Sequence, residues 1–165
     1  MRFIRHCANV DQYLILSFNA RRVLAPGIGV NFPTVHAQLS EALGDLRLPW
    51  AGLYSYAVRL MALGQMLDRP NFTLQLAGCS YDEHWGLIEK YAEPVLARLT
   101  TVEDFVGCYE SRYTGLACYN ETLMSLAAAY LALGRPEEAK QVVARLRSDP
   151  DRQAMAAYVS RFRRT

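Results

Sequence analysis

The residue types best suited to chemistry occur together in one short run, Asp82-Glu83-His84-Trp85. A carboxylate beside an imidazole can act in general acid/base catalysis when the fold directs both at one substrate. Successive helical residues point about 100° apart, so these side chains do not converge if the run is helical. Acidic residues are also favoured in the first turn of a helix, at the positive end of its dipole. We therefore interpret the run as the start of a helix.

The other ligand-type and nucleophilic residues are dispersed. His6 and His36 have no carboxylate or cysteine at the spacing of metal ligands. The cysteines include no C-x-x-C pair, which favours free thiols; they are Cys7, Cys79, Cys108 and Cys118. There is no G-x-S-x-G, H-E-x-x-H or P-loop motif, and the segment 27–29 lacks the third glycine of a dinucleotide-binding loop. The sequence predicts no catalytic residue, no metal site and no cofactor.

Aromatic residues give a stronger signal than catalytic types. Tyr109, Tyr113 and Tyr119 are close in sequence, and Arg112 lies among them. Tyrosine and arginine are enriched at protein–protein hot spots. Helical spacing places Tyr109 and Tyr113 on one face. The alternative is that these tyrosines form the wall between helices, with their hydroxyls reaching water. We interpret the cluster as part of a partner-binding surface.

Composition narrows the class of protein. The chain has 165 residues, of which 52% are hydrophobic, so one domain over residues 1–165 can hold a core without disulfides. Lys+Arg number 18 and Asp+Glu 16, for a net charge of +2, and the one dense basic run is the last five residues, 161–165. This balance argues against nucleic acid as a partner. The apolar run 13–18 is too short for a signal peptide or a membrane span, so we expect a cytoplasmic protein that does not bind membranes.

Apolar residues recur mainly at helical spacing. We expect helices from Thr34 to Leu46, from Ser80 to Leu99, from Thr101 to before Gly115, and three more between residue 120 and the C-terminus. The stripe of the second helix runs through Trp85, Ile88, Ala92, Val95 and Leu99. Pro94 predicts an interruption near Tyr91.

Strand signals are weak. Phe72–Leu76 alternates apolar and polar residues but has no evident partner strand, and the Pro/Gly-rich segment 26–33 is expected to be a long loop. The predicted fold class is all-α, with six to eight helices arranged as stacked antiparallel hairpins or as an irregular helix bundle.

Residues 120–153 resemble a tetratricopeptide repeat, a helical hairpin of about 34 residues. The matching residues are Leu126, Ala127, Tyr130, Gly134 and Ala139. A second hairpin is expected at 54–77, where Leu63-Gly64 resembles Leu133-Gly134. The resemblance implies that the first helices of the pairs line an inner groove. Residues away from the packing stripe would then be exposed in that groove: Glu121, Met124, Ala128 and Leu131.

The sequence thus favours a non-enzymatic protein-binding module. The specific expectation is a bacterial immunity protein that binds and neutralises a cognate toxin, with a secretion chaperone or adaptor as an alternative. A small-ligand-binding protein or enzyme with a dispersed site, and a scaffold that forms a homodimer, are further alternatives. The candidate partner-binding residues are Tyr109, Arg112, Tyr113, Tyr119, Glu121 and Met124.

Overall fold

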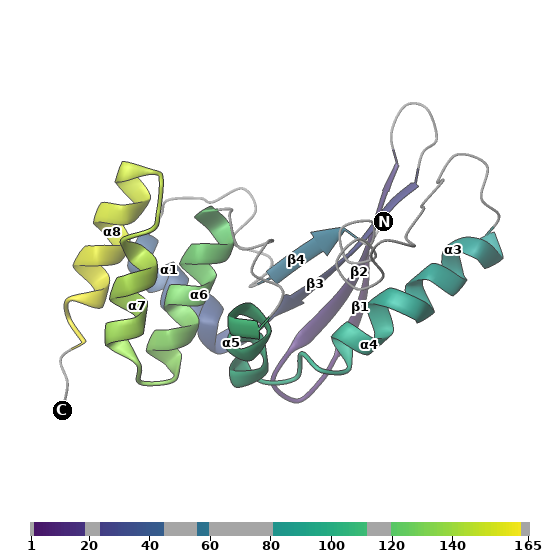
Figure 1. Ribbon diagram of the computed structural model, residues 1–165, viewed down its shortest axis with the longest axis horizontal. Coiled ribbons are helices and arrows are strands. Elements are labelled where there is room, and N and C mark those ends of the chain that lie inside the picture. The colour runs from purple at the N-terminus through teal and green to yellow at the C-terminus, as the bar shows by residue number, and fades with distance from the viewer. Residues whose placement is uncertain (1, 19–23, 45–55, 60–80, 112–119, 163–165) are drawn as a thin grey trace. The chain divides into compact units, whose positions relative to one another are not determined.

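The computed structural model describes residues 2–18, 24–44, 56–59, 81–111 and 120–162 (Figure 1). The chain divides into two compact units. Unit 1 comprises Met1–Val30 and Ala57–Thr100, and unit 2 comprises Asn31–Tyr56 and Thr101–Thr165. The length and composition of the chain predict one domain over residues 1–165. Because each unit draws on two separate segments, no single linker marks a boundary in the sequence.

Four strands form one sheet in the order β1-β2-β3-β4. Their bounds are Arg2–His6 for β1, Asp11–Phe18 for β2, Leu24–Asn31 for β3 and Tyr56–Arg59 for β4. β1 and β2 are antiparallel, with Arg2 opposite Ile15 and His6 opposite Asp11. Between them the Cys7 amide donates to the Val10 carbonyl at 3.0 Å. The small sheet is not predicted from the sequence, and β4 corrects the start of the helical hairpin expected at 54–77, whose remaining residues lie outside the described ones.

The structure corrects the expectation of a long loop at 26–33, because most of this segment belongs to β3. Gly27, Ile28, Gly29 and Val30 are all buried. A strand that is buried on both faces shows no alternation of apolar and polar residues. The glycine and proline residues of this segment are also more typical of a loop than of a strand. The segment therefore has neither the alternation nor the residue types that usually indicate a strand.

The main helical element of unit 1 is a rod with three parts. α3 spans Tyr81–Leu87, the π-helical turn η1 spans Ile88–Ala92, and α4 spans Glu93–Leu96. In the π turn the Glu93 amide donates to the Ile88 carbonyl, five residues back. Pro94 has no amide hydrogen, and its ring disfavours the regular i to i−4 pattern. The predicted interruption near Tyr91 is therefore confirmed, in the form of a π turn.

The buried side of this rod differs from the predicted stripe at one end. Ile88, Ala92, Val95 and Leu99 are buried as expected, but Trp85 is 45% exposed. A π turn advances fewer degrees per residue than an α-helix, so it rotates the buried side relative to the preceding turns. Extrapolating a straight α-helix placed Trp85 on the buried side, and that prediction is wrong.

A buried polar side chain connects the sheet of unit 1 to the rod. Gln12, on β2, is 3% exposed and donates from Nε2 to the Leu96 carbonyl at 2.6 Å. Its Oε1 accepts from Arg5 Nε at 2.7 Å, and Arg5 Nη1 forms an ion pair with Glu93 at 3.1 Å. Carbonyls at a helix C-terminus lack intrahelical partners. The Leu96 carbonyl accepts from the Leu99 amide at 3.2 Å, and Gln12 gives it a second donor away from water.

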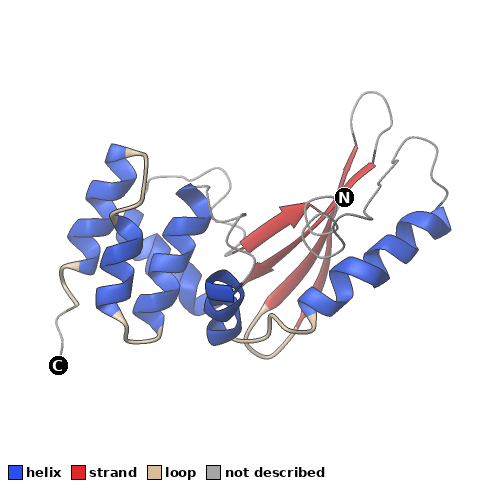
Figure 2. Cartoon of the chain, in the orientation of Figure 1, coloured by secondary structure: helices blue, strands red, loops and turns tan. Residues whose placement is uncertain are grey.

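Unit 2 is a helical assembly (Figure 2). Its helices are α1 (Pro33–Leu43), α5 (Val102–Ser111), α6 (Asn120–Ala132), α7 (Pro136–Val143) and α8 (Asp149–Val159). α6 and α7 form an antiparallel hairpin, α8 packs on α7, and α1 packs against both α6 and α8. The described chain is mainly helical, which confirms the predicted class.

The helix ends of unit 2 follow their sequence signals. At the start of α5, the Asp104 amide donates to Thr101 Oγ1 and the Thr101 amide donates to Asp104 Oδ2, which together form a capping box at the helix start expected near Thr101. Ser148 caps α8. α6 ends in a Schellman motif, in which the Gly134 amide donates to the Leu131 carbonyl and the next amide donates to the Tyr130 carbonyl.

Two glycine-to-alanine changes should have opposite effects on stability. Gly134 has φ of +69°, which strains any residue with a Cβ, so Gly134→Ala is expected to lower the free energy of unfolding by about 1 kcal/mol. Gly107 lies inside α5, and a Cβ there would meet nothing within 4 Å. Gly107→Ala is expected to raise that free energy by about 0.5–1 kcal/mol. Urea denaturation of both variants checks the pair, and equal effects would contradict it.

A tyrosine connects α8 to α1 within unit 2. The Tyr158 hydroxyl donates to Glu41 Oε2 at 2.8 Å and lies 2.8 Å from Gln38 Oε1. Its ring contacts Phe162 edge-on, with centroids 5.3 Å apart. Burial, followed by the hydrogen bond to Glu41, raises the pKa of Tyr158 to about 12. The neutral phenol is thus favoured in the folded chain.

Stability should fall in strongly alkaline solution because of this tyrosine. Its pKa is raised from 10.0 to about 12, so the folded state holds the proton more tightly than the unfolded state. The stabilisation of the folded state by Tyr158 is complete below pH 10.0 and is lost as the pH rises towards about 12. Thermal melts of the wild type and Tyr158→Phe across this range test the expectation. The variant should lose less stability, and parallel losses would contradict the assignment.

Candidate functional site

The structure describes three of the six predicted partner-binding residues, all in unit 2. Tyr109 is half-buried on α5, Glu121 is exposed in the first turn of α6, and Met124 is buried in the same helix. The other three lie outside the described residues: Arg112, Tyr113 and Tyr119. Tyr109 and Glu121 are therefore the described candidates with surface available to a partner.

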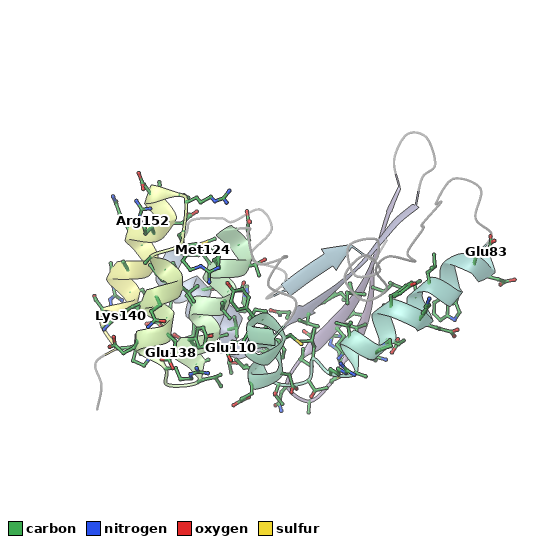
Figure 3. All side chains as sticks on the ribbon, in the orientation of Figure 1. Glu83, Glu110, Met124, Glu138, Lys140 and Arg152 are labelled. Carbon is green, nitrogen blue, oxygen red and sulfur yellow. The ribbon has the colours of Figure 1, made fainter. Side chains whose placement is uncertain are left out.

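The structure corrects the expectation that α6 exposes a groove. Met124 is 1% exposed, and Ala128 and Leu131 are buried as well. Nine consecutive residues of α6, 123–131, are buried, because α1, α5, α7 and α8 all pack against this helix. α1, which is far from α6 in the sequence, thus covers the side of α6 that the hairpin resemblance expected to line an open groove. Figure 3 labels Met124 on α6.

Tyr109 is paired with an arginine from the other side of the hairpin. The guanidinium carbon of Arg145 lies 5.7 Å from the centroid of the Tyr109 ring, and Arg145 is exposed. An arginine over an aromatic face is held there by cation–π attraction. The Tyr109 hydroxyl oxygen is buried and has no hydrogen-bond partner among the described residues. Tyr109 and Arg145 therefore offer a partner an aromatic ring with a guanidinium group over its face.

A polar network lies next to this pair, centred on Glu110. Tyr130, on α6, donates its hydroxyl to Glu110 Oε1 at 2.6 Å. Arg135 Nη2 lies 3.6 Å from the same oxygen, and Arg135 Nε donates to Glu138 at 2.9 Å. The Arg135 guanidinium also covers the Tyr130 ring at 4.7 Å. Each polar group in the network thus has a partner.

The environment of Tyr130 keeps its hydroxyl protonated. Burial raises the pKa of Tyr130 well above its usual value, and the hydrogen bond and negative charge of Glu110 raise it further. Arg135 acts in the opposite direction. The neutral hydroxyl therefore remains a hydrogen-bond donor to Glu110 throughout the physiological pH range.

The Tyr109–Arg145 pair and the Glu110 network adjoin each other at α5, where Tyr109 and Glu110 are neighbours in sequence. We name this part of unit 2 the α5–α7 surface, and its members are Tyr109, Glu110, Arg135 and Arg145, while the buried Tyr130 supports Glu110 through their hydrogen bond. Figure 3 labels Glu110 and Glu138, which approach the α6–α7 turn from two elements. Tyr109 is one of the residues predicted from the sequence, whereas Arg135 and Arg145 are not. Arg135 precedes α7 and Arg145 follows it. Both are far from α5 in the sequence, so only the geometry of the α6–α7 hairpin brings them to α5.

The acid/base run and the ligand-type residues add no chemical centre to the described structure. Asp82 and Glu83 are exposed in the first turn of α3, as predicted for a helix start, while the His84 side chain lies outside the described residues. Among the described residues, no group of His, Cys, Asp and Glu is arranged to hold a metal ion. No described helix is both long and apolar enough to cross a bilayer.

Comparisons of this chain with protein-family models, with curated proteins and with solved structures find no match.

Proposed function

We propose that this chain is a non-enzymatic protein-binding module, and specifically a bacterial immunity protein that binds and neutralises a cognate toxin in the cytoplasm. The observation that carries the proposal is the α5–α7 surface. It combines an aromatic ring, two arginines and a carboxylate within one helical unit. Tyrosine and arginine are the residue types that contribute most to protein–protein affinity.

The two arginines of this surface are held in place by neighbouring side chains, which supports a role in binding. Arg145 is held by the Tyr109 ring, and Arg135 is held by both Tyr130 and Glu138. Immobilising a long side chain at an interface costs about 0.5–1.5 kcal/mol, and a side chain that is already fixed avoids most of that cost. A partner with acidic and aromatic groups would meet arginines whose positions are set before contact.

Neutralisation in cells tests this proposal. The protein encoded by the neighbouring gene is expressed in bacteria, first alone and then together with this chain. Growth arrest by the neighbour alone and rescue by the wild-type chain are expected. Tyr109→Ala and Arg145→Ala should weaken the complex by about 30-fold or more, the loss typical of a hot-spot residue. Rescue should then fail at low expression.

The control for these variants is Lys140→Ala. Lys140 is exposed on α7 and pairs with Glu137, outside the α5–α7 surface, so its loss should leave rescue intact. Circular dichroism checks that every variant is folded. A neighbour that is harmless, or a toxin that this chain does not bind, would overturn the immunity function. Full rescue by both folded surface variants would overturn the proposed surface.

A further inference from the structure

The rod of unit 1 exposes an aromatic ring whose orientation is fixed. Trp85, on α3, is 45% exposed, and its indole N–H donates to Glu89 Oε1 at 2.8 Å. The two residues are separated by one helical turn, so the hydrogen bond holds the ring along the helix. A large exposed aromatic side chain with few freely rotating bonds is an efficient binding group, because little conformational entropy is lost on contact.

Two carboxylates, those of Asp82 and Glu89, share the helix side of this ring. Asp82, Trp85, Gly86 and Glu89 follow the i, i+3, i+4, i+7 spacing of one helix side, and all four are exposed. We name these four residues the Trp85 face. Glu83 is also exposed on α3 and is labelled in Figure 3. A Cβ at Gly86 would meet nothing within 4 Å, so the backbone beside the ring is open.

Helix-dipole effects explain only part of this negative charge. Asp82 and Glu83 lie in the first turn, where acidic residues stabilise a helix. Glu89 lies beyond that turn, where the dipole no longer favours a carboxylate. A carboxylate there, bonded to an exposed indole, places negative charge at the edge of an aromatic face. Both groups attract cations.

We propose that the Trp85 face binds a basic segment of a partner protein. A lysine or arginine of that segment would lie over the Trp85 ring and pair with Glu89, while a second basic residue would pair with Asp82. The negative charge of the face excludes nucleic acid and anionic lipid as occupants. The inference rests on unit 1 alone and does not depend on the function proposed for the α5–α7 surface.

Peptide titration tests this inference directly. The chain has two tryptophans, so Trp50→Phe leaves Trp85 as the one indole reporter in the full chain. An oligo-arginine peptide should change its fluorescence, and an oligo-glutamate peptide of equal length should not. Added salt should weaken binding, because the contact is electrostatic and exposed. Calorimetry with Trp85→Ala should show binding about tenfold weaker, within the range of a cation–π contact.

Glu89→Gln separates charge from ring orientation. The amide oxygen of glutamine can still accept the indole hydrogen bond, but the negative charge is lost. This variant should bind the oligo-arginine peptide more weakly and with a smaller salt dependence. Glu103→Gln, which removes an exposed carboxylate from unit 2, should bind as the wild type does.

Three results would overturn the proposal. One is unchanged fluorescence with oligo-arginine, and another is equal affinity for the wild type and Trp85→Ala. The third is a chain that is dimeric by light scattering and becomes monomeric in Trp85→Ala, since a second copy would then cover this face. None of these results bears on the neutralisation experiment, so the two proposals can fail separately.

Discussion

Met124→Asp is expected to unfold unit 2. Met124 is 1% exposed in the middle of the buried run of α6, and α1 packs against that helix. A carboxylate there would be removed from water without an arranged partner, which places the change in the class that costs more than about 4 kcal/mol. Aspartate is too short to reach solvent along the helix, as a lysine could.

Glu121→Asp is the matched control, because it introduces the same residue into the same helix at an exposed position. It should change the free energy of unfolding by less than about 0.5 kcal/mol. Far-UV circular dichroism and amide hydrogen exchange of α6 measure both variants. A folded Met124→Asp chain with protected α6 amides would show that this helix faces an open groove after all, as the hairpin resemblance implies.

Phe105→Ala is expected to lower the free energy of unfolding by about 3–5 kcal/mol. Phe105 on α5 is 2% exposed, and its ring centroid lies 6.0 Å from that of Phe32, which is fully buried just before α1. The pair joins segments that are far apart in sequence. Truncation removes the apolar contact and leaves a cavity, and both changes destabilise the chain.

Phe162→Ala provides the comparison for the same chemical change. Phe162 is part-buried near the C-terminus and contacts Tyr158, so its loss should cost about 1 kcal/mol. Denaturation curves of both variants, and of Phe32→Ala with and without Phe105→Ala, give the difference and the coupling between the two rings. Equal losses for Phe105→Ala and Phe162→Ala would contradict the placement of Phe105 in the core.

The helices of unit 2 could be predicted because their signals are local. The capping box at Thr101, the cap at Ser148 and the positive φ of Gly134 each act within a few residues of the helix end. Apolar periodicity then identified buried residues of α1 and α7, but not the burial of α6 on all sides. Pro94 predicted the position of the π turn in the same way, since its missing amide acts on the preceding turn.

The sheet could not be predicted, because its signals depend on distant parts of the chain. β3 is buried over Gly27–Val30, and glycines occupy the positions where a half-exposed strand would alternate. The burial of Met124 depends likewise on α1, which no periodicity within α6 can reveal. The exposure of Trp85 follows from the angular offset of a π turn, whose position could be predicted but whose rotation could not.

Most of the candidate site was hidden for the same reason. Tyr109 was recognisable from its type and its neighbours, but Arg135 and Arg145 reach α5 through the hairpin of α6 and α7. Glu110 and Tyr130 are 20 residues apart and form a 2.6 Å hydrogen bond that no local pattern marks. Three of the predicted residues, Arg112, Tyr113 and Tyr119, keep the status of predictions, because they lie outside the described residues.

Hydrogen–deuterium exchange of the full chain, alone and in complex with the neighbouring gene product, tests the central claim most directly. The claim is that a protein partner covers the α5–α7 surface. It predicts slower exchange in α5, in the α6–α7 turn beside Arg135 and at the end of α7 beside Arg145, with α8 unchanged. A stable complex that leaves exchange in α5 and α7 unaltered would contradict it.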